Sequence, residues 1–163
     1  MLLASKAAGV KRIVQYSSSE VYGSAKYVPM DENHPTLPLS TYAVSKLAAD
    51  RLCYTLHHEQ KIPVIILRQF NVYGPRETQP YVIPELITQL NKKSELHLGN
   101  VSARRDFTYV TDVAKATLMA AESDVSGEII NIGTGKPQSV NHLARLIGGK
   151  TMHIPKRPGE PDS

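Results

Sequence analysis

A continuous apolar run in the middle of the chain, Val64-Ile65-Ile66-Leu67, constrains the fold more than any other feature of the sequence. A run without apolar–polar alternation is typical of a central parallel strand that is covered on both faces. Two further short strands are expected, at Arg12–Ser17 and Glu128–Ile132. The sequence therefore predicts a parallel sheet that needs helices on both of its sides.

Helical patterns alternate with these strands, whereas residues 23–40, rich in Pro, Ser, Gly and Asn, are expected to form a loop. This alternation of strand and helix predicts an α/β fold. The expected helices are a small one ending near Gly9, one that begins at a capping Ser40 or Thr41 and stops before Pro63, one over 83–91, one from a cap at Thr111-Asp112 to about 121, and one over 139–147; the tail from Lys150 is expected to be extended.

The composition is that of an ordinary globular domain, with 163 residues, 41% apolar and 21% charged. No apolar run approaches the ~18 residues of a membrane span, and the first residues lack the pattern of a signal peptide. A single cysteine, Cys53, excludes an internal disulfide and lies in a helical pattern where a small buried apolar residue is the simplest interpretation. These features predict a cytoplasmic protein in a reducing compartment, not bound to a membrane.

The net charge of +4 is mild, and the basic residues occur as scattered pairs. This spread favours a small anionic ligand, such as a diphosphate, over a nucleic acid, which needs a concentrated basic surface. No metal site is expected, because His57 and His58 are adjacent and fall on different faces of a helix. The pairs are Lys11-Arg12, Lys92-Lys93, Arg104-Arg105 and Lys156-Arg157.

A Gly-rich turn between a strand and a helix normally receives the pyrophosphate of a dinucleotide. No such turn opens this chain. The segment Gly133-Thr134-Gly135 follows a strand, but a third glycine at the required spacing is missing, so a plain turn is the better interpretation.

Tyr42 and Lys46 are four residues apart at the start of the long helix, which places the phenol and the ammonium on one helix face. A phenol with its ordinary pKa of ~10 is a poor base at neutral pH. A nearby cation stabilises the phenolate and lowers that pKa, so this pair can act as an acid/base. The spacing alone is weak evidence, because it arises by chance in many helices.

Hydroxyl and amide side chains follow two of the expected strands, in Ser17-Ser18-Ser19-Glu20-Val21-Tyr22-Gly23 and in Arg68-Gln69-Phe70-Asn71-Val72-Tyr73-Gly74-Pro75. Carboxyl ends of parallel strands border the crevice where ligands bind. Together with Tyr42-x-x-x-Lys46, these segments resemble the extended short-chain dehydrogenase/reductases, and more narrowly the NAD-dependent nucleotide-sugar epimerases and dehydratases. The segments 105–112, 131–135 and Arg157-Pro158-Gly159-Glu160 are similar to that family as well.

The resemblance implies an enzyme that uses NAD rather than NADP. Tyr42 would take the proton from the sugar 4-hydroxyl, and Lys46 would hold the cofactor ribose and lower the pKa of Tyr42. Ser18 aligns with the catalytic hydroxyl residue of the family, while Ser17 and Ser19 would face the sheet interior or cap a turn.

The resemblance also implies residues that bind the cofactor and a nucleotide-diphosphate sugar. Phe70 would pack by the nicotinamide, although a core aromatic is an equal alternative. Asn71 and Arg105 would bind the diphosphate, since a guanidinium fork matches phosphate oxygens, whereas Arg104 would face solvent. The nucleotide end would meet Leu98, Arg157 and Glu160, with His97 nearby or simply on the surface.

Members of this family share the oxidation of sugar C4 to a 4-keto intermediate and differ in the later steps of the reaction. Glu20 matches the residue that removes the C5 proton in the 4,6-dehydratases, which makes a dehydratase the favoured reaction. Ser19 departs from the dTDP-glucose dehydratases, which carry Asp at that position as an acid. A UDP-sugar 4-epimerase and a decarboxylase therefore remain alternatives.

The resemblance covers nearly the whole chain but begins after the family's Gly-rich cofactor-binding segment. We therefore expect a partial Rossmann-like parallel sheet, with residues 1–75 as the end of the NAD-binding domain and 76–163 as an incomplete substrate-binding α/β region. The isolated chain would then be inactive, as a truncated product, a split subunit or a non-catalytic remnant. The full-length form is expected to be a homodimer, again by resemblance only.

Overall fold

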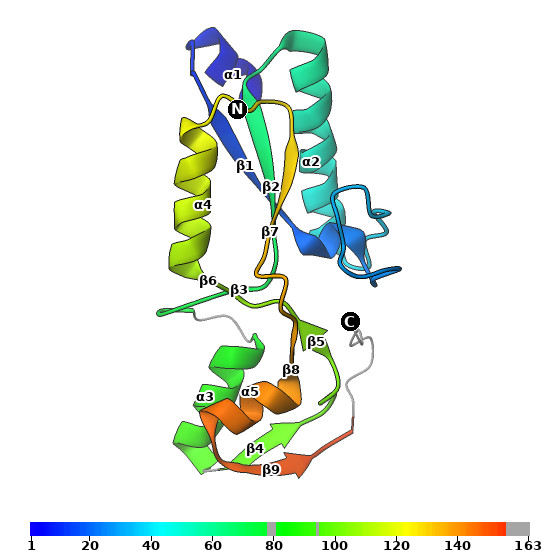
Figure 1. Cartoon of the computed structure of the whole chain (residues 1–163), viewed down its shortest axis with the longest axis vertical. Helices are drawn as coiled ribbons and strands as arrows, with labels where there is room; N and C mark the ends of the chain where they lie inside the picture. Colours follow the sequence, from blue (N-terminus) through cyan, green and yellow to red (C-terminus); the bar gives the residue numbers. More distant parts are fainter. Residues whose placement is uncertain (78–80, 94, 156–163) are drawn as a thin grey trace. The chain divides into compact units, whose positions relative to one another are not determined.

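The computed structural model describes residues 1–77, 81–93 and 95–155, which form two compact units (Figure 1). The first unit comprises Met1–Val72 and Thr108–Gly133, and the second comprises Tyr73–Phe107 and Thr134–Ser163. The functional assignment of 1–75 to the cofactor and 76–163 to the substrate stays a prediction.

The first unit is built on a three-stranded parallel sheet with the order β1-β2-β7. The strands are β1 (Ile13–Ser18), β2 (Val64–Gln69) and β7 (Ile129–Ile132). The central strand β2 carries the apolar run and is buried along residues 64–68, as expected of a parallel strand covered on both faces. The predicted α/β fold with a parallel sheet is thus confirmed.

Helices α2 (Thr41–Gln60) and α4 (Val110–Glu122) lie on opposite sides of this sheet (Figure 1). Alternate residues of β2 point to opposite faces because the side-chain period of a strand is two. Val64 and Ile66 pack with Cys53 of α2, and Leu2 of the short helix α1 (Leu2–Ala7) joins them. Ile65 and Leu67 pack instead with Ala120 of α4. Each helix therefore buries its own side of the same strand.

The two long helices begin in different ways. Ser40 caps α2 by accepting a hydrogen bond from the backbone N–H of Ala43 at 3.0 Å, which selects one of the two predicted caps. The predicted cap of α4 at Thr111-Asp112 is wrong, since both residues lie inside the first turn and the N-cap is Tyr109, without a side-chain cap. The helix starts early because strand β6 (Thr108–Tyr109) runs directly into it.

Residues 23–40 form the expected loop, which follows the 3₁₀ helix η1 (Ser19–Tyr22). Gly23 begins this loop with a φ of 69°, and a side chain there would collide with the carbonyl oxygen of Leu37. The backbone N–H of Leu37 also donates to the carbonyl of Tyr22 at 3.4 Å. Only glycine lets the two ends of the loop approach each other this closely.

The second unit packs two helices against short strands. Its helices are α3 (Val82–Lys93) and α5 (Val140–Ile147), and β4 (Glu95–Leu98) pairs in parallel with β9 (Lys150–His153). Strand β5 (Arg104–Arg105) pairs antiparallel with β8 (Gln138–Ser139), and β3 (Val72–Tyr73) follows β2 in the chain. The core of the unit comprises Leu86, Leu96, Leu98, Leu143 and Ala144. In the part of the chain that the structure describes, no helix is long and apolar enough to cross a membrane.

Candidate active site

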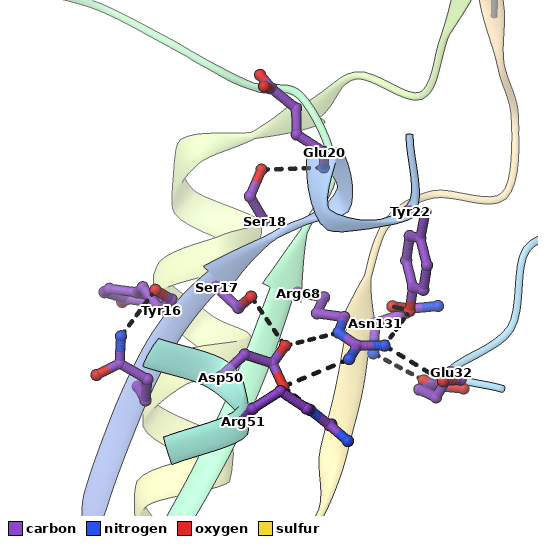
Figure 2. A network of polar contacts seen from close by, with 11 residues as sticks. Tyr16, Ser17, Ser18, Glu20, Tyr22, Glu32, Asp50, Arg51, Arg68 and Asn131 are labelled. Atoms are coloured by element: carbon purple, nitrogen blue, oxygen red, sulfur yellow. Dashed lines mark hydrogen bonds and ion pairs between the residues drawn. The ribbon is translucent and has the colours of Figure 1, made fainter. Parts of the chain in front are cut away.

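Ser18 and Glu20 lie where β1 ends, on the turn that leads into η1. The buried Ser18 is the last residue of β1, and its Oγ accepts a hydrogen bond from the backbone N–H of Glu20 at 3.2 Å (Figure 2). A hydroxyl that accepts here can still donate its proton to a ligand oxygen. The Glu20 side chain is exposed, and its Oε2 accepts from Ser40 Oγ at 3.3 Å. The Glu20 turn is thereby joined to the start of α2.

Tyr42 and Lys46 lie in the first two turns of α2. The Tyr42 side chain is 49% exposed, so its phenol is accessible to a ligand. Lys46 Nζ lies 5.7 Å from the centroid of the Tyr42 ring and donates to the carbonyl oxygen of Tyr16 at 3.1 Å. The ammonium thus lies on the same helix face as the phenol, as the four-residue spacing predicts, and it also contacts β1.

A buried polar row crosses the sheet on the side that α2 covers. The strand register places Ser17, Arg68 and Asn131 side by side on β1, β2 and β7. Asp50 of α2 reaches into this row: its carboxylate accepts from Ser17 Oγ at 3.0 Å and from Arg68 Nε at 2.8 Å (Figure 2). The Arg68 guanidinium also donates to the Tyr22 hydroxyl at 3.0 Å, and that hydroxyl donates to Asn131 Oδ1 at 2.6 Å.

Burial would lower the pKa of the Arg68 guanidinium, but its hydrogen bonds to Asp50 and Tyr22 outweigh that effect and hold the pKa above its ordinary value. The row therefore contains a permanent cation whose counter-ion is Asp50. Ser17 is committed to this row, whereas Ser18 points to the opposite face and caps the turn that carries Glu20.

The buried ion pair of Asp50 and Arg68 was not predicted from the sequence, nor was the hydrogen bond from Ser40 to Glu20. One signal was present, because Arg68 directly follows the apolar run and Asp50 lies four residues after Lys46 on the inner side of the helix. A charged residue inside a buried strand requires a partner. Which residue supplies it is set by the tertiary structure.

Phe70 and Asn71 follow β2 at the same end of the sheet. The half-buried Phe70 donates its backbone N–H to the carbonyl of Ile132 at 2.9 Å. The Asn71 side chain is exposed, while its carbonyl accepts from the backbone N–H of Thr108 at 2.9 Å. Their roles at the nicotinamide and the diphosphate stay predictions.

The remaining predicted binding residues belong to the second unit or lie outside the described residues. Leu98 is 3% exposed and packs in the apolar core of the unit, so its side chain contributes to stability there. The half-buried Arg105 lies on β5, and its guanidinium donates to the carbonyl of Arg104 at 2.7 Å. Arg104 is exposed as predicted. Arg157 and Glu160 lie outside the described residues.

The turn at Thr134-Gly135 binds a carboxylate of its own unit. Asp106 accepts from the backbone N–H groups of Thr134 at 3.1 Å and Gly135 at 2.7 Å. These are the groups that a phosphate would need. The geometry agrees with the interpretation of this segment as a turn rather than a phosphate loop.

Among residues 1–77, 81–93 and 95–155, no three His, Cys, Asp or Glu side chains are grouped as metal ligands. The predicted site residues place a hydroxyl and a carboxylate where β1 ends, and a phenol and an ammonium in the first two turns of α2. This set of groups suits proton transfer to and from an oxygen-rich ligand.

Comparison with known proteins identifies the protein family in which this arrangement of residues occurs. Residues 1–133 match the NAD dependent epimerase/dehydratase family. The chain belongs to this family. The predicted family and the Rossmann-like fold are thereby confirmed, and NAD, the predicted cofactor, is the one that the family description names.

The names of the relatives describe different reactions. A putative UDP-glucose 4-epimerase of Methanocaldococcus jannaschii is 39% identical over 160 residues, covering 92% of this chain and 52% of that protein. A dTDP-D-glucose 4,6-dehydratase of Mus musculus is 40% identical over 142 residues, covering 86% and 40%. The structure of UDP-glucuronic acid 4-epimerase from Bacillus cereus with UDP-glucuronic acid and NAD superposes with a TM-score of 0.87 at 33% identity, covering 99% of this chain and 54% of that one. The chain thus spans about half the length of the curated relatives it matches.

Proposed function

We propose that the full-length protein that carries this chain is an NAD-dependent nucleotide-sugar 4,6-dehydratase. The observation that carries this proposal is the exposed Glu20 carboxylate in the turn after β1, hydrogen-bonded to Ser40 and adjacent to Ser18. A dehydratase needs a base for the C5 proton in addition to the groups that oxidise C4. Glu20 provides a carboxylate in the same turn as the Ser18 hydroxyl.

The residues at this end of the sheet fit the nicotinamide riboside part of NAD. Lys46 offers an ammonium and Tyr42 an accessible phenol on one helix face, which suits the hydroxyl groups of a ribose. When bound, NAD supplies the acceptor for the hydrogen and the two electrons that leave sugar C4.

The chain's own residues would handle the protons of both stages. Tyr42 accepts the proton of the 4-hydroxyl, and the Lys46 ammonium beside it favours the phenolate. Ser18 donates a hydrogen bond to the same sugar oxygen. Once C4 is a ketone the C5 proton becomes acidic, and Glu20 would remove it and pass it to the departing 6-hydroxyl, which leaves as water. The hydride taken from C4 would then be returned to C6 and a proton, equivalent to the one that Tyr42 took up, to C5, which gives the 4-keto-6-deoxy product with no net change of the cofactor. Asn71 and Arg105 would bind the diphosphate.

The test measures C4 oxidation and dehydration separately in the full-length protein supplied with NAD and a nucleotide hexose. Glu20→Gln keeps the size and the hydrogen bond to Ser40 but cannot accept a proton. We expect it to abolish the 4-keto-6-deoxy product while the absorbance of reduced nicotinamide still rises. Glu59→Gln, an exposed carboxylate near the other end of α2, is the matched control and should retain both signals. Dehydration at the normal rate in Glu20→Gln would reject Glu20 as the base.

A UDP-sugar 4-epimerase is the second candidate, and Ser19 favours it. Loss of the 6-hydroxyl needs a proton donor. Ser19, the residue before Glu20, offers only a hydroxyl group and no carboxylic acid for this step. An epimerase needs no base at C5, so Glu20→Gln would then leave epimerisation unchanged. Formation of the C4 epimer without any dehydrated product, in both the wild type and this variant, would replace the first proposal with the second.

A further inference from the structure

The strongest unexplained feature of the first unit is the ion pair between Asp50 and Arg68. The side chains are 0% and 2% exposed, and the guanidinium meets both carboxylate oxygens, at 2.8 and 3.4 Å. Taking two charges out of water is costly, and a buried pair can often be replaced by apolar residues without loss of stability. The other face of the same sheet is filled in that way, by Ile65, Leu67 and Ala120. Stability alone therefore does not account for the pair.

Asp50 lies on α2 four residues after Lys46 and eight after Tyr42, so the three residues follow one another along one side of the helix. Two polar contacts one helical turn apart join this side to consecutive residues of β1. Lys46 Nζ binds the carbonyl oxygen of Tyr16 at 3.1 Å, and Asp50 binds Ser17 Oγ at 3.0 Å. Directional contacts of this kind fix the position of a helix along a strand, whereas apolar packing tolerates small shifts.

Arg68 extends the same connection to the loop that precedes α2. Its guanidinium donates to the Tyr22 hydroxyl and to the carbonyl of Glu32, at 3.0 and 3.2 Å (Figure 2). The Glu32 carboxylate accepts in turn from the backbone N–H of Asn131 at 2.7 Å. The ends of β1 and β2, the η1 turn with Glu20, and the long loop thus all contact one buried pair or its direct partners.

We propose that Asp50 and Arg68 are positioning residues, which hold α2 on the sheet so that Tyr42 and Lys46 stay aligned with Ser18 and Glu20. Neither residue acts on the substrate itself. The inference rests on the proposed function, since alignment matters only if these four side chains act together. A misplacement of about 1 Å can reduce a catalysed rate about 100-fold, so a small shift of α2 has a large effect.

The test separates stability from alignment in the full-length protein. Asp50→Leu alone leaves Arg68 as an unpaired buried cation, and the melting temperature should fall strongly. The triple variant Ser17→Ala, Asp50→Leu, Arg68→Met removes the charges and the hydroxyl together and should regain most of the melting temperature. We expect kcat of the triple variant to remain about 10- to 100-fold below that of the wild type, with KM for the nucleotide sugar within about threefold.

A second variant covers the case in which the triple variant does not fold. Ser17→Ala removes only the hydrogen bond between Asp50 and β1, and it should lower kcat severalfold at unchanged KM. Arg51→Met is the matched control, because Arg51 contacts Asp50 at 3.1 Å but is half exposed and does not reach the sheet. Its kcat should equal that of the wild type.

Recovery of wild-type kcat together with melting temperature in the triple variant would overturn the inference, as would a wild-type kcat in Ser17→Ala. Failure of the proposed function is a separate result, namely no C4 oxidation by the wild type. In that case hydrogen exchange at the backbone amides of residues 42–46 decides the inference. Faster exchange in Ser17→Ala than in Arg51→Met supports it, and equal exchange overturns it.

Discussion

The two faces of the sheet in the first unit bury their helices by different means. Toward α4, Ile65 and Leu67 of β2 meet Ala120 and form an apolar contact along the strand. Toward α2, Val64 and Ile66 form a similar contact, but the next residue on that face is Arg68. The same strand therefore ends in a buried ion pair on the α2 face, whereas on the α4 face its two aliphatic residues are followed by the half-buried Gln69.

This difference follows the location of the candidate active site. Apolar burial supplies free energy without direction, whereas a fully satisfied polar row specifies one arrangement. The polar row lies under α2, the helix that carries Tyr42 and Lys46, and at the carboxyl end of the sheet. Helix α4 carries none of the four proposed catalytic side chains, although Ser18 of β1 points to the face of the sheet that α4 covers. We infer that the contacts on the α4 side mainly stabilise the unit. The contacts on the α2 side mainly fix the orientation of helix α2 on the sheet.

The largest effect that tests this division is expected for Leu67→Ala. Leu67 is 0% exposed, so its truncation should lower the free energy of unfolding by about 3 kcal/mol, through lost burial and the cavity left behind. The turnover per folded molecule should stay within about twofold of the wild type, because the polar row keeps its contacts. Urea denaturation and steady-state kinetics of the full-length protein measure the two quantities. A large loss of kcat at temperatures where the variant is folded would contradict the division.

The three strands of the parallel sheet and the Tyr42–Lys46 pair could be predicted because they depend on local patterns. A continuous apolar run, a four-residue spacing and a capping serine are each visible within a few residues. The α4 cap was predicted wrongly for the same reason, since Thr111 and Asp112 are both capping residue types, but β6 leads into the helix at Tyr109, less than one turn earlier. The start of α4 is therefore set by where β6 ends and not by the capping preference of Thr111 and Asp112.

The polar row could not be derived from the sequence. Asp50 and Arg68 are 18 residues apart, and Asn131 is much farther along the chain; only the strand register brings Arg68 and Asn131 side by side. The interior position of Leu98 likewise depends on the packing of α3 and α5 around β4. Which nucleotide and which sugar are bound depends on contacts that no short pattern specifies.

A smaller effect is expected for Tyr22→Phe, which alters the polar row without adding a charge. The Tyr22 hydroxyl links Arg68 to Asn131, and its loss should lower the free energy of unfolding by about 1–2 kcal/mol. Burial raises the pKa of the Tyr22 phenol, although Arg68 and Asn131 act in the opposite direction. The folded state therefore holds this proton more tightly than the unfolded state does.

The sign of the pH dependence follows from that difference. The contribution of Tyr22 is fully present below the ordinary phenol pKa of ~10 and is lost as the pH rises through the higher value of the folded state. Tyr22→Phe should consequently reduce the decline in stability above pH ~10. Urea denaturation of both proteins at neutral and alkaline pH measures this. An equally steep alkaline decline in the variant would show that Tyr22 does not contribute.

The smallest effect is expected for Tyr16→Phe, the matched tyrosine on the α4 face. The Tyr16 hydroxyl is 2.7 Å from Thr117 Oγ1 of α4, but the side chain is 41% exposed, so water can replace the lost partner. The free energy of unfolding should change by less than about 0.5 kcal/mol. The carbonyl of Tyr16 that binds Lys46 is unaffected by the substitution, so kcat should not change either. Two tyrosines of one chain, each deprived of one hydroxyl, thus compare the faces directly. An equal loss in the free energy of unfolding for Tyr16→Phe and Tyr22→Phe would contradict this division. Hydrogen bonds would then contribute equally to holding α2 and α4, and the polar row would not distinguish the α2 face.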